Sequence, residues 1–242
     1  MKIALISDIH GNLHALEAVL AEIKREGVEQ IICLGDVAAV GPQPKEVIAR
    51  LRELECPVVM GNTDAWMSVP EEAARVEPLL PEPLFDINEW ALARLSTDDI
   101  QYMHDFPMTL TVELGGGHTL LCFHGSPNSY NDIIQAPTLA EELDQMIGDH
   151  HATILAGGHT HTTMLRRHRD MQIVNPGSVG SPLVVFSDVK RNPARVEYAL
   201  ITNYGNNPTI EFRHVLIDVE QTLQTARDVN MPQFDWWAAS WR

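Results

Sequence analysis

Residues with metal-binding side chains recur directly after short apolar runs along much of this chain. They lie in the stretches SDIHGN (7–12), GDVAAVG (35–41), GNTD (61–64), FHGS (123–126) and GGHTH (157–161). Their carboxylate, amide and imidazole groups, which borderline divalent metals accept as ligands, belong to Asp8, His10, Asp36, Asn62, His124, His159 and His161. In an open α/β sheet, residues that follow several strands converge at one edge of the sheet. The pattern therefore predicts an α/β fold that gathers these side chains into one metal site.

The apolar spacing between these stretches predicts strands and helices that alternate. Continuous apolar runs are typical of strands buried on both faces, and leucine and isoleucine at intervals of three and four residues are typical of helices. The expected elements are a strand over 2–7, a helix between Asn12 and Gly27, a strand over 31–34, a helix between Pro44 and Pro57, and a strand over 58–60. Such a βαβαβ order favours a parallel sheet with helices on its faces.

Residues 65–118 interrupt this order. Five prolines break the apolar pattern here, and only the stretches near 86–95 and 97–105 have helical spacing. We predict that this segment is a cap-like helical insertion over the metal site, within a single domain that spans residues 1–242. Gly115, Gly116 and Gly117 at its end are most simply a hairpin turn.

Strand patterns return after the insertion and then change in kind. Strands are expected over 119–123 and 153–156, with a helix near 138–147 between them. Around 195–200 and 210–213 apolar and polar residues alternate strictly, which indicates antiparallel strands with one face in water. We therefore expect two stacked mixed sheets flanked by helices.

The chain is strongly acidic, with 17 Lys and Arg against 33 Asp and Glu and a formal net charge of −16. This charge disfavours bulk nucleic acid and anionic membranes as partners, because their phosphates are repelled over most of the surface. A substrate phosphate needs local attraction from metal ions or from a few arginines, such as Arg166 and Arg167; a solvated pair of charges at a strand end is the alternative for these two. The three cysteines have no CxxC spacing, and the sequence begins without a signal-peptide or transmembrane pattern. We expect a cytoplasmic protein.

The last residues, 230–242, are rich in tryptophan. Trp236, Trp237 and Trp241 crowd this tail, although chain ends are usually mobile and polar. We expect the tail to pack on the body of the same chain; docking on a second subunit is the alternative, which leaves a homo-oligomer open.

The spacing of the metal-binding residues favours two ions. Asp8 and His10, like His159 and His161, are two residues apart and so share one face if the backbone is a strand. The two carboxylate oxygens of Asp36 could bridge two ions. Two ions about 3.5–4 Å apart acidify a bridging water and hold the oxygens of a substrate during in-line attack by the resulting hydroxide. That chemistry suits phosphoester hydrolysis better than acyl transfer.

The motifs D-x-H, G-D, G-N-x-D, H-G and G-H-T-H, in this order, resemble those of the calcineurin-like metallophosphoesterase family. The chain is most similar to the small bacterial and archaeal phosphoesterases that begin with S-D-I-H-G-N and carry N-P-G-S after the last motif, as residues 175–178 do here. The resemblance covers roughly residues 1–181. It implies a four-layer α/β/β/α sandwich and hydrolysis of a phosphodiester or phosphomonoester bond in a small phosphorylated molecule or nucleotide.

The resemblance also implies which residues hold each ion. One ion would be bound by Asp8, His10, Asp36 and His161, and the other by Asp36, Asn62, His124 and His159. Members of the family use Mn, Fe, Zn, Co or Ni, and these ligands do not select among them.

One position departs from the family pattern. Most relatives have histidine at the third position of G-N-x-D, where it is thought to protonate the leaving group or stabilise the transferred phosphoryl; here that position is Thr63. A hydroxyl is a poor general acid near neutral pH. We therefore predict slower turnover and a preference for good leaving groups, with Asp64 bonded to Thr63 or to the backbone. The predicted catalytic residues are Asp36, Asn62, Thr63 and Asp64.

Three other functions remain open at this stage. A dinucleoside polyphosphate hydrolase and a protein phosphatase are narrower versions of the same chemistry, and no identifiable substrate-contacting residue favours either. A catalytically weak binding scaffold with the same fold is the alternative from another class. The complete set of seven ligands argues against the scaffold, whereas Thr63 keeps it open.

Overall fold

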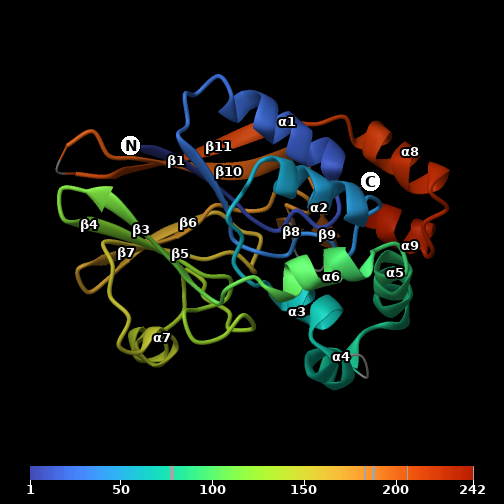
Figure 1. Cartoon of the computed structure of the whole chain (residues 1–242), viewed down its shortest axis with the longest axis horizontal. Coiled ribbons are helices and arrows are strands. Elements are labelled where there is room, and N and C mark those ends of the chain that lie inside the picture. Colours follow the sequence, from blue (N-terminus) through green and yellow to red (C-terminus); the bar gives the residue numbers. More distant parts are fainter. Residues whose placement is uncertain (77–78, 183, 187–188, 206, 242) are drawn as a thin grey trace.

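The computed structural model describes residues 1–76, 79–182, 184–186, 189–205 and 207–241. Two mixed sheets are stacked on each other, and helices cover their outer faces (Figure 1). This arrangement confirms the expected α/β fold with two stacked mixed sheets flanked by helices. Among the described residues, no helix is long and apolar enough to cross a membrane.

The first sheet contains strands from both ends of the chain. Its members, in spatial order, are β11 (Thr209–Leu216), β10 (Arg195–Thr202), β1 (Lys2–Ile6) and β2 (Gln30–Cys33). β1 and β2 are parallel, and β10 is antiparallel to both of its neighbours. The strand expected over 58–60 is only one parallel bridge between Val58 and Cys33. It is short because the chain enters α3 (Asn62–Ser68) three residues beyond Val59.

The second sheet is built from the middle of the chain. Its order is β3 (Leu110–Gly115), β4 (His118–Cys122), β5 (Ile154–Ala156), β7 (Met171–Asn175) and β6 (Met164–His168). The three central strands are parallel, and the two edge strands are antiparallel to their neighbours. The three consecutive glycines form the turn of the β3–β4 hairpin, with φ of 83°, 65° and 80°. Such positive values suit glycine, which has no Cβ. A separate short hairpin pairs β8 (Val184–Phe186) with β9 (Val189–Arg191).

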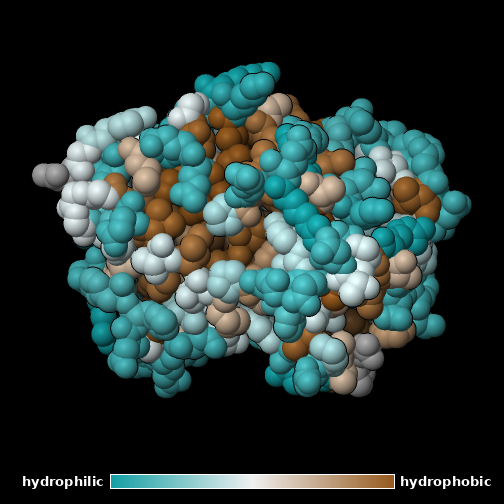
Figure 2. Space-filling view, in the orientation of Figure 1, coloured by the Kyte–Doolittle hydropathy of each residue, from teal (hydrophilic) through white to brown (hydrophobic). Residues whose placement is uncertain are grey.

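Helices complete the outer layers. The first sheet is covered by α1 (Leu13–Ile23), α2 (Pro44–Glu53), α8 (Val219–Asp228) and α9 (Phe234–Ala238), and the second by α7 (Ala140–Ile147). The Asn12 side chain caps α1 by accepting a hydrogen bond from the backbone of Ala15, as its position in the sequence predicts. Figure 2 shows hydrophilic residues over the helices at the rim of this face and an apolar band between them.

Alternate side chains of a buried strand belong to different parts of the hydrophobic core. On β1, Ile3 and Leu5 face the second sheet, whereas Ala4 and Ile6 pack under the helices. Each such isoleucine or leucine contributes about 1.5–3 kcal/mol when fully buried. The prediction of one wet face is right for β11, whose burial alternates, but wrong for β10, which is buried on both faces. β10 lies between two other strands and under α1, so even its Glu197 is buried.

The described part of the proline-rich segment is mostly helical, and Pro70 and Pro83 lie at the starts of helices instead of ending them. It contains α3 (Asn62–Ser68), α4 (Pro70–Val76), α5 (Glu82–Leu92) and α6 (Thr97–His104). Pro70 is the first residue of α4, and Pro83 lies in the first turn of α5, where a missing backbone N–H costs nothing. Ile87 and Met103 belong to the same buried cluster as α1 and α2.

The tryptophan-rich tail contains α9 and a 3₁₀ turn, η2 (Ala239–Trp241). Trp237 and Trp241 are buried against the helical side of the first sheet, with ring centroids 5.9 Å apart. Trp236 is 48% exposed. Two of the three indoles therefore pack within the chain itself.

Candidate metal centre

The predicted ligands lie just beyond the ends of β1, β2, β4 and β5. Asp8 and His10 follow β1, Asp36 follows β2, Asn62 begins α3, His124 follows β4, and His159 and His161 follow β5. These strands run parallel within their own sheets, so their carboxyl ends meet at one edge of the molecule.

The backbone at this edge is unusual. Asp8, His10, Asp36, His159 and His161 all have positive φ, between 47° and 67°. A left-handed backbone costs a residue other than glycine about 1–2 kcal/mol, and such strain concentrates at functional sites. The expectation that Asp8 and His10 share one face of a strand is wrong, because β1 ends at Ile6. Consecutive turns bring these side chains together instead.

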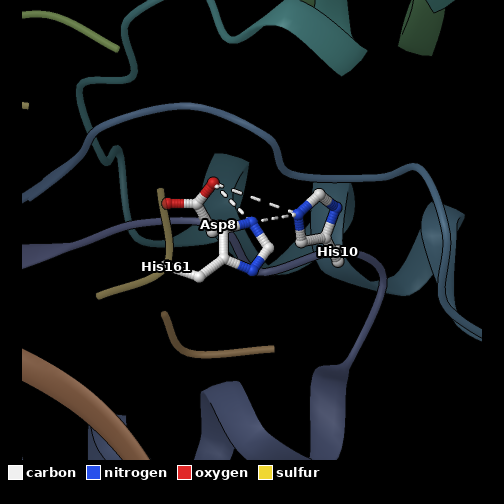
Figure 3. Close-up of side chains that lie close together, drawn as sticks. All are labelled: Asp8, His10 and His161. Carbon is white, nitrogen blue, oxygen red and sulfur yellow. Dashed lines mark hydrogen bonds and ion pairs between the residues drawn. The ribbon is translucent and has the colours of Figure 1, made fainter. Parts of the chain in front are cut away.

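Asp8, His10 and His161 form the first group of potential ligands (Figure 3). Nε2 of His161 lies 3.2 Å from Oδ1 of Asp8 and 3.1 Å from Nε2 of His10. His10 and Asp8 are almost fully buried, whereas the His161 side chain is 18% exposed. The three donor atoms point toward one another from two distant parts of the chain.

Asp8, Asp36 and His124 form the second group. Nε2 of His124 lies 3.5 Å from Oδ1 of Asp36 and 3.0 Å from Oδ1 of Asn62. The His159 ring lies 5.1 Å from the His124 ring, measured between centroids. His159 is outside both three-residue groups, but it borders the second one.

Asp8 belongs to both groups, and Asp36 faces a histidine of each. Its Oδ1 faces Nε2 of His124, and its Oδ2 lies 3.7 Å from Nε2 of His10. Each oxygen of one carboxylate thus faces an imidazole from a different group.

The hydrogen bonds of the imidazoles fit metal binding. Nδ1 of His124 lies 2.6 Å from the carbonyl oxygen of Leu34, and Nδ1 of His161 lies 2.6 Å from that of Ser181. Each Nδ1–H therefore donates to a carbonyl, which fixes the ring with Nε2 facing the carboxylates of the site. Metal-ligating histidines are held in this way. Oδ1 of Asp8 is buried and accepts no hydrogen bond. A divalent cation would supply the missing partner, so this set of ligands fits one.

The charges of the site also favour the binding of a cation. Burial raises the pKa of Asp36, but His124 and His10 outweigh burial and hold this pKa below its usual range. Burial also disfavours a charge on His124, yet Asp36 and Asp8 raise its pKa to about 10, so a cation that binds here replaces a proton on this imidazole. Burial lowers the pKa of His10 to about 4, which keeps its imidazole neutral near pH 7. The carboxylates therefore stay ionised and attract positive charge into the site.

Residues outside the predicted set hold the Asp8 turn in place. Ser7 donates from Oγ to Oδ2 of Asp8 at 2.6 Å, and Ser178 donates from Oγ to the carbonyl of Asp8 at 2.8 Å. The backbone N–H of Gly180 donates to the same carbonyl. The N-P-G-S motif marks Ser178 in the sequence, whereas Ser7 and the carbonyls of Leu34 and Ser181 have no sequence pattern that identifies them.

Asn175, the first residue of that motif, supports the His159 turn. Its side-chain amide donates to the carbonyl of Gly158 at 2.5 Å and to Oγ1 of Thr160 at 3.1 Å. The late loop thus supports the turns on both sides of the site.

Thr63 and Asp64 have different surroundings. The backbone N–H of Thr63 donates to Oδ1 of Asp36 at 2.9 Å, and its hydroxyl is buried without a hydrogen-bond partner. The Asp64 carboxylate accepts from the backbone N–H groups of Asp36, Val37 and Gly61 at 2.7, 2.9 and 3.0 Å. Asp64 was expected to bond either to Thr63 or to the backbone, and in the structure it bonds to the backbone.

Arg166 is engaged away from the site. Its Nη1 donates to the carbonyls of Gln135, Ala136 and Thr138, each at 2.9 Å. Arg166 therefore stabilises the loop before α7, and Arg167 is an exposed residue of β6.

A family model described as the calcineurin-like phosphoesterase superfamily domain matches residues 1–202. An uncharacterized protein of Methanocaldococcus jannaschii, MJ0912, is 26% identical over 227 residues, which cover 84% of this chain and 90% of that protein. Phosphodiesterase YfcE of Escherichia coli is 39% identical over 75 residues, which cover 27% of this chain and 41% of YfcE.

Solved structures have the same fold. A metallophosphoesterase from Sphaerobacter thermophilus superimposes with a TM-score of 0.73 at 25% identity, covering 99% of both chains. Hypothetical protein PH1004 from Pyrococcus horikoshii superimposes with a TM-score of 0.82 at 20% identity, covering 99% of this chain and 97% of the other.

Proposed function

Because the chain belongs to the calcineurin-like phosphoesterase superfamily, and is a metal-dependent phosphoester hydrolase, we propose that it works with two divalent ions. Its substrate is a phosphodiester or phosphomonoester of a small molecule or nucleotide. Asp8, His10, Asp36 and His161 hold one ion, and Asp36, Asn62, His124 and His159 hold the other. Manganese, iron, zinc, cobalt and nickel all fit these ligands.

The position of Asp36 carries this proposal. Its two oxygens face His10 on one side and His124 on the other, at 3.7 and 3.5 Å. A carboxylate with an imidazole facing each of its oxygens can be a ligand to two ions at once, and this supports the proposal of a pair. When bound, a pair of ions supplies an acidified water and neutralises charge on the phosphate oxygens.

The residues of the chain position and retain these groups. The hydrogen bonds from His124 to Leu34 and from His161 to Ser181 fix the ring orientations, and the N–H of Thr63 orients the Asp36 carboxylate. Asp64 holds the Asp36 and Gly61 turns at a fixed separation through backbone bonds. We assign Asp64 a positioning role on this basis.

The surroundings favour a small substrate. The net charge of −16 repels polymeric phosphates, and Arg166 is bonded to carbonyls of its own chain. His161 and His159 are the least buried of the seven ligands, so a phosphate group approaches from their side. All three cysteines are free and buried, which supports the expected cytoplasmic location.

Metal-stripped protein should be tested with Mn, Ni, Co, Zn and Mg on a phosphoester panel. The panel contains bis-p-nitrophenyl phosphate, p-nitrophenyl phosphate, a dinucleoside polyphosphate and a phosphopeptide. We expect two metal equivalents per chain and metal-dependent turnover of the small esters. Bound metal without turnover of any ester would favour a binding scaffold, and a single equivalent in the active protein would exclude the dinuclear site.

A further inference from the structure

Strand β11 is the outer edge of the first sheet in the described part of the chain. It pairs with β10 along all eight of its residues, from Thr209 opposite Thr202 to Leu216 opposite Arg195. No other described strand pairs with its far side. Figure 1 shows the two strands as a long hairpin whose turn projects from one end of the molecule. A long free edge offers a row of backbone N–H and C=O groups to another strand.

The sequence of β11, TIEFRHVL, is complementary to itself around Phe212. When two identical strands pair antiparallel about a twofold axis, residues at equal distances from the axis lie opposite each other. With the axis at Phe212, Glu211 lies opposite the partner's Arg213, and Arg213 lies opposite the partner's Glu211. Two pairs of opposite charges thus form across the axis.

Neighbouring registers lack this complementarity. An axis at Glu211 places two glutamates opposite each other, and an axis at Arg213 places two arginines opposite each other. Like charges directly opposite in a sheet are destabilising. Because each copy carries a net charge of −16, a stable pair of copies needs such local attraction.

Two exposed apolar side chains lie at the ends of the same hairpin. Leu216, at the end of β11, is 83% exposed, and Tyr204, in the turn before β11, is 81% exposed. With the axis at Phe212, Leu216 lies opposite the partner's Pro208, beside the turn that carries the partner's Tyr204. Pairing in this register places Leu216 against the end of the partner's hairpin.

We propose that β11 is the interface of a homodimer in which two copies join edge to edge. The partner is a second copy of this chain, with Phe212 on the twofold axis, and the two first sheets become one continuous sheet. Arg213 also contacts Glu26 at 3.2 Å and Glu211 of its own chain at 3.0 Å. Its guanidinium has five N–H donors, so these contacts leave donors for the partner's Glu211. The proposal is independent of the metal centre.

Charge reversal tests both the interface and its register. Dimerisation of the full chain is measured by sedimentation equilibrium over a concentration series. We expect the native chain to dimerise, and Glu211→Arg and Arg213→Glu each to weaken dimerisation about tenfold or more, because each creates two pairs of like charges. An equimolar mixture of the two variants should form heterodimers, in which both pairs are again opposite in charge.

Arg227→Glu is the matched control, since it makes the same change of charge on α8 and should leave dimerisation unchanged. Thermal unfolding of each variant checks that it folds, and Glu211→Arg keeps the contact between Arg213 and Glu26. A native chain that stays monomeric overturns the proposal. So does a dimer that neither reversal weakens, or a mixture that dimerises no better than its components.

Discussion

His124 and Asn62 reach the candidate centre without a left-handed backbone, whereas Asp8, His10 and His161 reach it from left-handed turns. His124 lies two residues beyond the end of β4 and its side chain is fully buried, while the His161 side chain is 18% exposed. In the His124 half, two of the four proposed ligands, His124 and Asn62, therefore have no left-handed backbone. In the His161 half all four have it, and the Asp8 turn depends on loop hydrogen bonds from Ser178 and Gly180. We expect the His124 half to bind its ion more tightly.

The largest effect is expected from the residue that both halves share. Asp36→Asn keeps the size of the side chain but removes the charge between the two groups. We expect loss of most bound metal and a fall in kcat of about a thousandfold or more, because several kcal/mol of charge stabilisation are lost. Metal analysis and steady-state kinetics measure both. Asp98→Asn, at an exposed carboxylate, is the control, and a variant of Asp36 with two bound ions would contradict the shared role.

The comparison of the halves is tested by removing one histidine from each. His161→Ala leaves the His124 half intact, and His124→Ala leaves the His161 half intact. We expect about one metal equivalent in each variant, with affinity at least about tenfold higher in His161→Ala because its remaining site is preorganised. Competition with a chelator measures both affinities. Equal affinities, or the reverse order, would break the comparison.

A smaller effect is expected at a glycine beside the shared carboxylate. A Cβ at Gly61 would overlap with the side chain and backbone nitrogen of Asp36, whereas a Cβ at Gly27 meets open space. We expect Gly61→Ala to weaken metal binding about 10–100-fold, which is the usual effect of changing a residue that positions a metal ligand. Gly27→Ala is the control; it places alanine at positive φ and should lower stability slightly without changing metal affinity. Equal metal affinity in the two variants would show that Asp36 tolerates displacement.

The smallest effect is expected at Thr63, next to the ligand Asn62. Thr63→His should raise kcat on esters with poor leaving groups several-fold, because imidazole is a better general acid than a hydroxyl. Rates on alkyl and aryl phosphodiesters are compared. Thr63→Val removes only the hydroxyl, which has no hydrogen-bond partner, and should change neither rate much. If Thr63→His does not improve the alkyl ester, the proposed leaving-group preference is wrong.

Local sequence signals predicted the fold where one interaction decides the outcome. Asn12 caps α1, and the three glycines form the turn of the β3–β4 hairpin. The sequence does not show whether one face of β10 is buried or both, because a small residue such as Ala199 occurs on buried and on solvated faces alike. The contact at Val58 is short because α3 begins at Asn62, and the apolar run over 58–60 does not show where that helix begins.

The site was predictable to the extent that it depends on side-chain chemistry. The seven residues selected for their ligand types converge at one edge of the sheets, although His159 lies outside both compact groups. The positive φ of Asp8 and His10 was not predictable, since neither residue is glycine. The carbonyl partners at Leu34 and Ser181 were also out of reach, because every residue has a carbonyl and only the fold aims it.

The three backbone hydrogen bonds to Asp64 have a consequence for the neighbouring position. Peptide N–H groups are the same whichever side chain follows Asn62, so the spacing between the two turns is set independently of residue 63. Residue 63 can therefore be threonine or histidine while the turns at Asp36 and Gly61 keep the same separation. If Thr63→His changes the leaving-group preference as we predict, reactivity toward different esters is retuned at a single codon without rebuilding the protein around it.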